Sequence, residues 1–200
     1  QEMDALFRQL QIHPIFISEF KQASWGLNGT VIHPGVDVVQ DFPGGYSGRQ
    51  PSLLRVCSNY QFREFMNGKS LGDQIVHGLP NLLLGENNGP ECTENNIHNG
   101  NRLTQVGMTR DFNHLREVLR EFRALVMTNI PAYEDGWNLS SLEAMAQGMP
   151  ILTSFHPRTP IIDGVNGFMS DRTDHLRGKA MELLRDREMS QELGARARET

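Results

Sequence analysis

Short apolar runs alternate with amphipathic stretches along most of this sequence of 200 residues. The apolar runs have the length of buried strands, and the amphipathic stretches carry apolar residues at the three- and four-residue spacing of a helix. Alternating strands and helices are typical of a parallel sheet, because a helix returns the chain to the edge where the next strand starts. The pattern therefore predicts an α/β fold whose parallel sheet has helices on both faces.

The expected elements can be placed by their residue ranges. Strands are expected at 15–17, 30–32, 53–57, 80–85, 103–106, 124–127, 150–153 and 167–169. Helices are expected at 2–10, 70–77, 112–122, 139–147 and 171–187. Asp111 and Asn138 are good N-caps for two of these helices, and Gly148 is a natural stop for the second of them. The inward face of that helix is expected to hold Leu139, Leu142, Met145 and Ala146.

Composition along the chain indicates its division into domains. The stretch 41–52 is rich in Gly, Pro and Ser and is interpreted as a linker, and the segments 58–69 and 86–101 are interpreted as loops. Residues 1–45 are therefore expected to be the end of another domain with its linker, and residues 46–200 a Rossmann-like domain. In such a domain, ligands lie in the loops at the carboxyl ends of the strands. Neither terminus shows a clear helix start or stop, so we expect the chain to be part of a longer protein.

Composition and charge exclude several classes of protein. The hydrophobic fraction of 38% and the charged fraction of 22% are those of a globular domain. No apolar run approaches the ~18 residues that span a bilayer, so no transmembrane segment is expected. The net charge of −5, without a cluster of Lys or Arg, argues against a nucleic-acid partner. Cys57 and Cys92 are too few for a disulfide framework and favour a reducing compartment.

Several common site motifs are missing from the sequence. It contains no Gly-x-x-x-x-Gly-Lys-Ser/Thr, no His-Glu-x-x-His and no Gly-x-Ser-x-Gly, and no Gly-x-Gly-x-x-Gly follows the strand at 53–57, which argues against NAD. The seven histidines are scattered, and no pair has metal-ligand spacing. His33 and Trp137 are interpreted as packing residues.

The loop before the helix at 139–147 holds the most informative group of residues. Asp135 precedes Glu143 by eight positions, and Gly136 between them would let a ligand approach the backbone closely. Carboxylates beside the free amides of a helix start suit a neutral, hydroxyl-rich ligand, because they accept strong hydrogen bonds from sugar hydroxyls. The alternative is that both acids only complement the helix dipole.

Two further loops carry cations that could meet a phosphate. Thr159, as the N-cap of a short helix that starts at Pro160, would offer free N–H groups to an anion, with Arg158 beside it. Arg63 and Lys69 follow the strand at 53–57 and could bind a diphosphate, Arg by paired hydrogen bonds and Lys as a point charge. The alternatives are an ordinary capped turn and a solvated basic pair.

The sequence DGWNLSSLEAMAQGMP at 135–150, with 151–154 and 161–168 after it, resembles the C-terminal, donor-binding domain of retaining GT-B glycosyltransferases of group 1. This family includes glycogen synthases and many mannosyl- and glucosyltransferases of polysaccharide biosynthesis. Its pattern is an acid, Gly, an aromatic residue and Gly, then a helix similar to Leu-Glu-Ala-Met-Ala, with two acids eight apart. Upstream, 17–20 and 31–37 resemble the crossing from the N-terminal domain. The resemblance implies one half of a GT-B fold.

The resemblance also implies roles for individual residues. Glu143 matches the glutamate that binds the nucleotide ribose, and Asp135 matches the acid that holds hydroxyls of the transferred sugar, one methylene shorter than the usual glutamate. These two are the expected catalytic residues. Gly136 and Trp137 match the turn whose amides face the sugar, and Asn138 replaces the usual second glycine.

The remaining donor-binding residues follow from the same resemblance. Arg63 and Lys69 match the diphosphate-binding Arg and Lys, with a spacing one residue longer than usual. Arg158 and Thr159 fall where a glycine-rich loop normally faces the donor phosphates. Leu139, at the start of the helix, completes the expected donor site.

The activity implied by the resemblance is the transfer of a hexose from a nucleotide-diphosphate sugar to an acceptor hydroxyl, with retention and with no metal or other cofactor. The acceptor, a carbohydrate or a lipid-linked sugar, would bind to an N-terminal domain that is nearly all outside this sequence, so the chain alone is expected to be inactive. The implied location is cytoplasmic, and a peripheral position at the inner membrane face is allowed for the full-length protein.

Two other classes of function remain open from the sequence. One is a nucleotide-sugar epimerase or a phosphorylase on the same fold, and the other is a non-catalytic domain that binds carbohydrate or nucleotide or serves as a scaffold. Calorimetry separates a transferase domain from a scaffold, because the former prefers a nucleoside diphosphate to the monophosphate and the latter binds neither.

Overall fold

Five strands form one parallel sheet in the computed structural model, which describes residues 2–86, 97–98, 101–102, 109, 111–133 and 136–200. The order is β4-β3-β7-β8-β9. The strands are β3 (Gln50–Val56), β4 (Asn81–Leu84), β7 (Phe122–Met127), β8 (Ile151–Ser154) and β9 (Gly167–Ser170). All four pairings are parallel, which confirms the predicted α/β fold.

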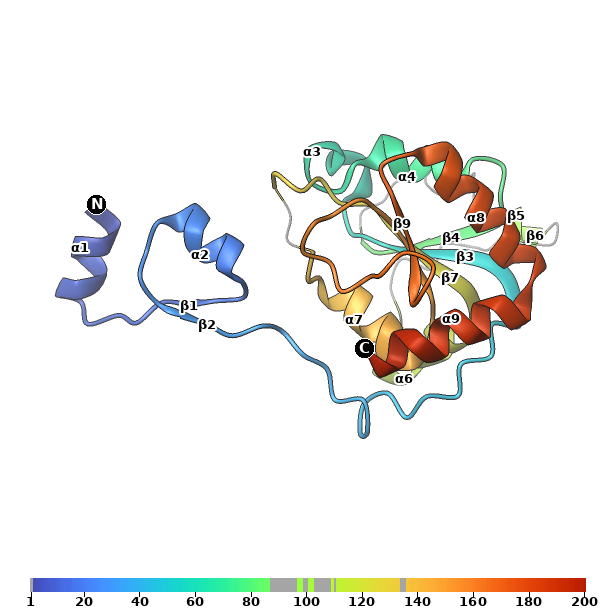
Figure 1. The fold of residues 1–200 in the computed structure, drawn as a ribbon, viewed down its shortest axis with the longest axis horizontal. Coiled ribbons are helices and arrows are strands. Elements are labelled where there is room, and N and C mark those ends of the chain that lie inside the picture. Colours follow the sequence, from blue (N-terminus) through green and yellow to red (C-terminus); the bar gives the residue numbers. More distant parts are fainter. Residues whose placement is uncertain (1, 87–96, 99–100, 103–108, 110, 134–135) are drawn as a thin grey trace.

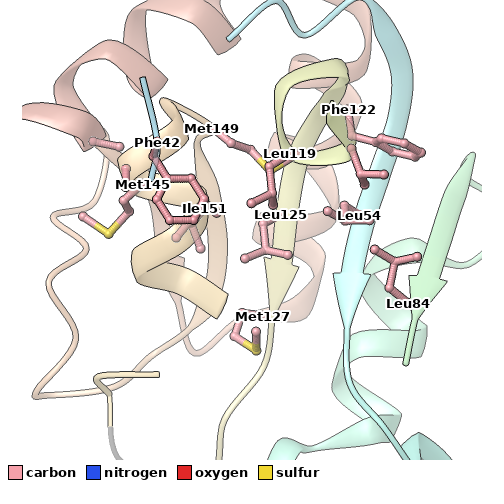
Figure 2. Close-up of a cluster of buried hydrophobic side chains, with 14 of the residues drawn as sticks. Phe42, Leu54, Leu84, Leu119, Phe122, Leu125, Met127, Met145, Met149 and Ile151 are labelled. Carbon is pink, nitrogen blue, oxygen red and sulfur yellow. The ribbon is translucent and has the colours of Figure 1, made fainter. Parts of the chain in front are cut away.

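Helices cover both faces of this sheet (Figure 1). One face carries α3 (Glu64–Asn67), α4 (Lys69–Val76) and α8 (Thr173–Arg185), and the other carries α6 (Phe112–Glu121), α7 (Leu139–Gln147) and α9 (Arg187–Glu199). Successive side chains of a strand point to opposite faces, so Leu53 packs on the side of α4 and α8 and Leu54 on the side of α6 and α7. Figure 2 shows the hydrophobic cluster on the side of α6 and α7, in which Leu54, Leu125 and Ile151 come from three neighbouring strands.

The N-terminal part of the chain forms a small unit of its own (Figure 1). It consists of α1 (Glu2–Gln9), β1 (Ile15–Phe16), α2 (Glu19–Trp25) and β2 (Thr30–Val31). The strands β1 and β2 pair in parallel. The helix at 2–10 and the strands near 15 and 30 are thus where the sequence predicts them.

Residues 38–48, here called the anchored segment, join this unit to the sheet domain. Phe42 of this segment is 1% exposed and lies in the core cluster of Figure 2. Backbone carbonyls of the segment accept hydrogen bonds from side chains of the domain: Val38 and Phe42 from Arg198, Asp41 from Arg116, Gly44 from Gln147, Ser47 from Arg187 and Gln191, and Gly48 from Arg123. Although its composition predicts a linker, this segment is bound to the domain along its length.

Several element limits differ from those expected. The strand β3 starts at Gln50 instead of residue 53, because Gln50 still pairs with Phe122 across a register shift. Phe122 is not the end of a helix but the first residue of β7. The helix expected at 171–187 is two helices, since Asp186 ends α8 and its side chain accepts from the Met189 amide as the N-cap of α9.

The loops also contain structure that the sequence did not indicate. The segment 58–69 holds a 3₁₀ turn (Tyr60–Phe62) and α3. The strand β5 (Ile97–His98) lies within the segment 86–101 and pairs antiparallel with β6 (Asn101–Arg102). The strand expected at 103–106 and Cys92 lie outside the described residues.

The helix α7 has the predicted limits, and Met145 and Ala146 of its predicted inward face are buried. Asn138 and Gly148 cap it as expected. Leu139, however, is 53% exposed, whereas Ser141, Ala144 and Met145 are buried. The hydrophobic side chain at the first helical position therefore faces away from the core.

Candidate functional site

An open cleft of about 220 Å³ lies at the carboxyl ends of β3 and β7, beside the start of α7. Parallel α/β sheets bind their ligands at this edge. Most of the side chains that line the cleft are uncharged and polar, and Arg63 is its one cation. The lining residues are Val56, Cys57, Ser58, Arg63, Asn67, Met127, Asn129, Asn138 and Ser140. Of these, only Arg63 and Asn138 were expected from the sequence.

The oxygen and the nitrogen of the Asn138 side-chain amide are in different hydrogen-bonding situations. Its Oδ1 accepts a hydrogen bond from the Ser141 amide at 2.8 Å, which is the predicted N-cap. Its Nδ2 is enclosed and has no hydrogen-bond partner in the described part of the chain. The amide thus completes the helix with its oxygen and leaves a donor beside the cleft.

Glu143 lies in the second turn of α7 and is partly buried. Burial raises the pKa of its carboxyl. No hydrogen bond or ion pair joins it to another residue that the structure describes. The cap of α7 is supplied by Asn138, and the dipole acts mainly within the first turn, so these structural roles do not account for Glu143. A partly desolvated acid without a partner is typical of a binding or catalytic site.

The other acid, Asp135, lies outside the described residues, and its position relative to Glu143 is untested. Gly136 is described, and a Cβ there would come within 2.5 Å of the Arg158 carbonyl carbon and the Thr159 amide nitrogen and 2.6 Å of His156 Nδ1. Glycine is therefore required because two loops pack together here, which is a different reason from the ligand approach that the sequence suggested.

Trp137 packs against a residue from the N-terminal part of the chain. Its ring centroid is 5.5 Å from that of His33, with the ring planes tilted by 37°. This ring contact is of the kind expected for packing residues. The contact also brings the start of the connection after β2 to the loop that precedes α7.

The short helix expected at Pro160 does not form, and 155–160 is a turn without a helix N-terminus. The buried side chain of Asn166 explains this, because it accepts from the Ile162 amide at 2.7 Å and donates to the Pro160 carbonyl at 3.0 Å. These bonds take the backbone groups that a helix would use. The predicted helix-terminus anion site is therefore wrong.

Arg158 is held by the protein itself. Its Nη2 donates to the Pro131 carbonyl at 3.2 Å, and its guanidinium carbon lies 3.9 Å from the centre of the Phe20 ring. Thr159 Oγ1 accepts only a long hydrogen bond from the Ile161 amide, at 3.5 Å. A phosphate role for Arg158 and Thr159 remains a prediction, and the contacts that the structure gives them are internal.

Arg63 and Lys69 are in different environments. Arg63 lines the cleft, and its Nη1 has a weak contact of 3.4 Å with the sulfur of Met66. Lys69 is not among the lining residues, and its Nζ donates to Asp73 Oδ2 at 2.7 Å. The structure therefore places one of the two expected cations at the cleft and pairs the other with a carboxylate.

Asp73 belongs to a buried polar cluster that the sequence did not reveal. Arg55, which is 4% exposed, donates to Asp73 Oδ1 at 2.9 Å and to the Tyr60 hydroxyl at 3.0 Å. Burial raises the pKa of Tyr60. Burial alone would raise the pKa of Asp73 as well, but hydrogen bonds and charges from Lys69 and Arg55 outweigh it and hold that pKa below its usual range. The sequence signal for this cluster was Arg55, a charged residue within the apolar run of a strand.

The missed lining residues share one sequence signal. Ser58 follows β3, Asn129 follows β7, Ser140 opens α7, and Asn67 ends the short helix α3. Each is a small polar residue that follows a strand or lies at the start of a helix, Asn67 being two positions before α4. In the described part of the chain, no group of three or more His, Cys, Asp or Glu residues could hold a metal. No described helix has the length and apolar character to cross a membrane.

Comparison with known proteins identifies the family of the chain. A family model described as "Glycosyl transferases group 1" matches residues 69–200. A comparison with curated proteins finds no match.

Solved structures resemble the chain in fold. S. aureus TarM has 18% identity and a TM-score of 0.67, over 94% of this chain and 39% of TarM. Anabaena Alr3699/HepE, solved with UDP and glucose, has 16% identity and a TM-score of 0.66, over 92% of this chain and 57% of HepE. The C-terminal domain of the Francisella tularensis group 1 family protein LpcC has 17% identity and a TM-score of 0.54, over 82% of this chain and 95% of that domain. The chain thus spans well under two thirds of TarM and HepE and matches one half of a GT-B fold.

Proposed function

Because the family model covers well over half of it, this chain belongs to the group 1 glycosyltransferases, and from this premise we propose that it binds a nucleotide-diphosphate sugar for transfer to an acceptor hydroxyl with retention. The observation that carries the proposal is Glu143, a partly buried carboxylate without a described partner on the helix beside the cleft. A carboxylate in this position accepts hydrogen bonds from ribose hydroxyls.

Arg63 is the group proposed to meet the diphosphate. In the transfer, the bond from the anomeric carbon to the diphosphate oxygen breaks, a bond to the acceptor oxygen forms and the acceptor proton passes to the departing diphosphate, so negative charge develops on the leaving group as the first bond breaks. A guanidinium at the cleft stabilises that charge by paired hydrogen bonds. Lys69 contributes less, because Asp73 already compensates its charge.

The other expected residues keep the roles that the resemblance implies, as proposals. Asp135 would hold hydroxyls of the sugar, Gly136 and Trp137 would form the turn facing it, and Leu139, Arg158 and Thr159 would border the donor. No metal or other cofactor is proposed. The acceptor, a carbohydrate or lipid-linked sugar, would bind to the N-terminal domain of a longer, cytoplasmic protein that can lie at the inner membrane face, and the chain alone would be inactive.

Calorimetry tests the proposal without requiring activity. UDP is the first probe, because Anabaena HepE was solved with UDP and with UDP-glucose. ADP, GDP and TDP, each with its monophosphate and its nucleotide sugar, complete the panel. We expect one diphosphate to bind more tightly than its monophosphate. Binding of no nucleotide in the panel would favour a scaffold domain instead.

A further inference from the structure

Two amide groups that border the cleft have unused hydrogen-bonding capacity. Asn138 Nδ2 and Asn67 Oδ1 are both enclosed, and neither has a hydrogen-bond partner among the residues that the structure describes. Both residues line the same cleft, Asn138 from the start of α7 and Asn67 from the end of α3. An enclosed polar atom without a partner costs free energy, so natural proteins keep few of them. Two in one cleft point to a ligand that completes them.

The orientation of the Asn138 amide follows from its cap. Since Oδ1 accepts from the Ser141 amide, the polar group of this side chain that is left for a ligand is Nδ2, a donor. The backbone of Asn67 is also held in place. Its amide donates to the Arg63 carbonyl at 2.8 Å, and the carbonyl of the next residue, Gly68, accepts from Thr128 at the end of β7 at 3.3 Å.

A donor and an acceptor together select one kind of ligand group. A hydroxyl can donate to Asn67 Oδ1 and accept from Asn138 Nδ2 at once, whereas a phosphate oxygen only accepts and would leave Asn67 Oδ1 unpaired. The other polar residues of the cleft, Ser58, Asn129 and Ser140, are neutral as well. The phosphate therefore falls to Arg63, and the amides suit a neutral, hydroxyl-bearing part of the ligand.

We propose that Asn67 and Asn138 together bind one hydroxyl group of the transferred sugar. This inference rests on the proposed function, which assigns the ribose to Glu143. Glu143 does not line the cleft and lies five residues beyond Asn138, about 7.5 Å further along the axis of α7. The groups inside the cleft thus meet a part of the donor other than the ribose, and the hydroxyls that remain are those of the sugar.

Exchange of Asn138 for serine tests the donor without removing the cap. Serine caps helices as well as asparagine does, but it has no second polar group to reach the cleft. We expect Asn138→Ser to weaken UDP-glucose binding about fivefold, the loss of one ordinary hydrogen bond, and to change UDP binding less than about twofold. Asn67→Ala should behave in the same way. If both amides bind one hydroxyl, the double variant should lose less than the product of the single losses.

A matched control is available at another helix. Asp111 caps α6 by accepting from the His114 amide at 2.8 Å and does not line the cleft. Asp111→Ser should leave both affinities unchanged. The nucleotide sugar that binds best in the panel, with its own diphosphate, replaces UDP-glucose and UDP if the base is not uracil.

The outcomes separate this inference from the proposed function. Equal losses for UDP and UDP-glucose would place the amides on the nucleotide and overturn the inference, as would unchanged UDP-glucose binding or fully independent losses. In these cases the wild-type chain still binds a nucleotide sugar and the proposed function stands. Wild-type protein that binds no member of the panel would remove the proposed function itself.

Discussion

Arg123, at the amino ends of the parallel strands, and Arg63 and Asn138, at their carboxyl ends, have opposite uses. At the amino ends of the strands, Arg123 donates to the carbonyls of Gly48, Leu183 and Leu184 and is 5% exposed. At the carboxyl ends, among the described residues, the Arg63 side chain has only a sulfur contact of 3.4 Å, and an amide donor of Asn138 has no partner. The first kind of group completes the fold, and the second kind is left for a ligand.

The difference teaches how to separate structural from functional polar residues in this chain. Hydrogen bonds made within the protein contribute to the free energy of unfolding, whereas a group kept for a ligand contributes little to it or opposes it. The separation is not complete, because Gln147 Oε1 and Arg120 Nε near the anchored segment also lack partners. Substitutions at each end should nevertheless change different quantities.

The largest effect is expected at the amino end. Arg123→Met removes the donors for three backbone carbonyls and should lower the free energy of unfolding by about 3–5 kcal/mol, measured by urea denaturation. Arg49→Met is the control, since Arg49 is 67% exposed and pairs with Glu121 on the surface; it should cost at most about 1 kcal/mol. Equal losses of unfolding free energy for both variants would show that the hydrogen bonds from Arg123 to the carbonyls stabilise the protein no more than a surface ion pair does.

Glu143 gives the largest effect expected at the carboxyl end. Glu143→Ala should weaken binding of the preferred nucleoside diphosphate by about 1.5–3 kcal/mol, the range for hydrogen bonds to a charged group, with little change in thermal stability. Calorimetry and a melting curve check the two parts. Glu192→Ala, on the exposed side of α9, should change neither. A variant that unfolds while its folded fraction binds normally would make Glu143 a structural residue.

The two cations that follow β3 sharpen the comparison within one loop. Arg63→Met should weaken diphosphate binding by about 1–2 kcal/mol, less in high salt, and leave nucleoside binding unchanged. Lys69→Met should have a smaller effect, because Asp73 already pairs with Lys69. Parallel titrations with UDP and uridine measure both. If Lys69→Met lost more diphosphate affinity than Arg63→Met, Lys69 would be a phosphate ligand, as the sequence predicts.

The smallest expected effect is a pH dependence of stability. Burial raises the pKa of Glu143 in the folded state above its unfolded value, so the folded protein binds this proton more readily. At neutral pH, wild-type protein should therefore be less stable than Glu143→Gln. This deficit should shrink as the pH falls through the folded pKa towards the unfolded value near 4.5. Urea midpoints of both proteins across this range check the sign, and a constant difference would mean that the carboxyl is not desolvated.

Much of the fold could be predicted because it follows from local rules. The limits of α7 follow from the cap chemistry of Asn138 and Gly148, and the parallel sheet follows from the alternation of apolar runs with amphipathic stretches. The family was also recognisable from the segment at 135–150, which lies within the matched range 69–200. The candidate site was predicted in part, with Glu143 partly buried and with Arg63 and Asn138 at the cleft.

What the sequence alone determined, then, was the order of strands and helices, their caps and the family, since these depend on neighbours within a few positions. Only the tertiary structure decided which polar groups are used inside the protein. Arg198 reaches the carbonyl of Val38 from 160 positions away, and Arg55 of β3 binds Asp73 of α4, 18 positions further along the chain. A side chain binds whichever partner the fold brings within about 3 Å, and no local pattern in the sequence encodes that partner.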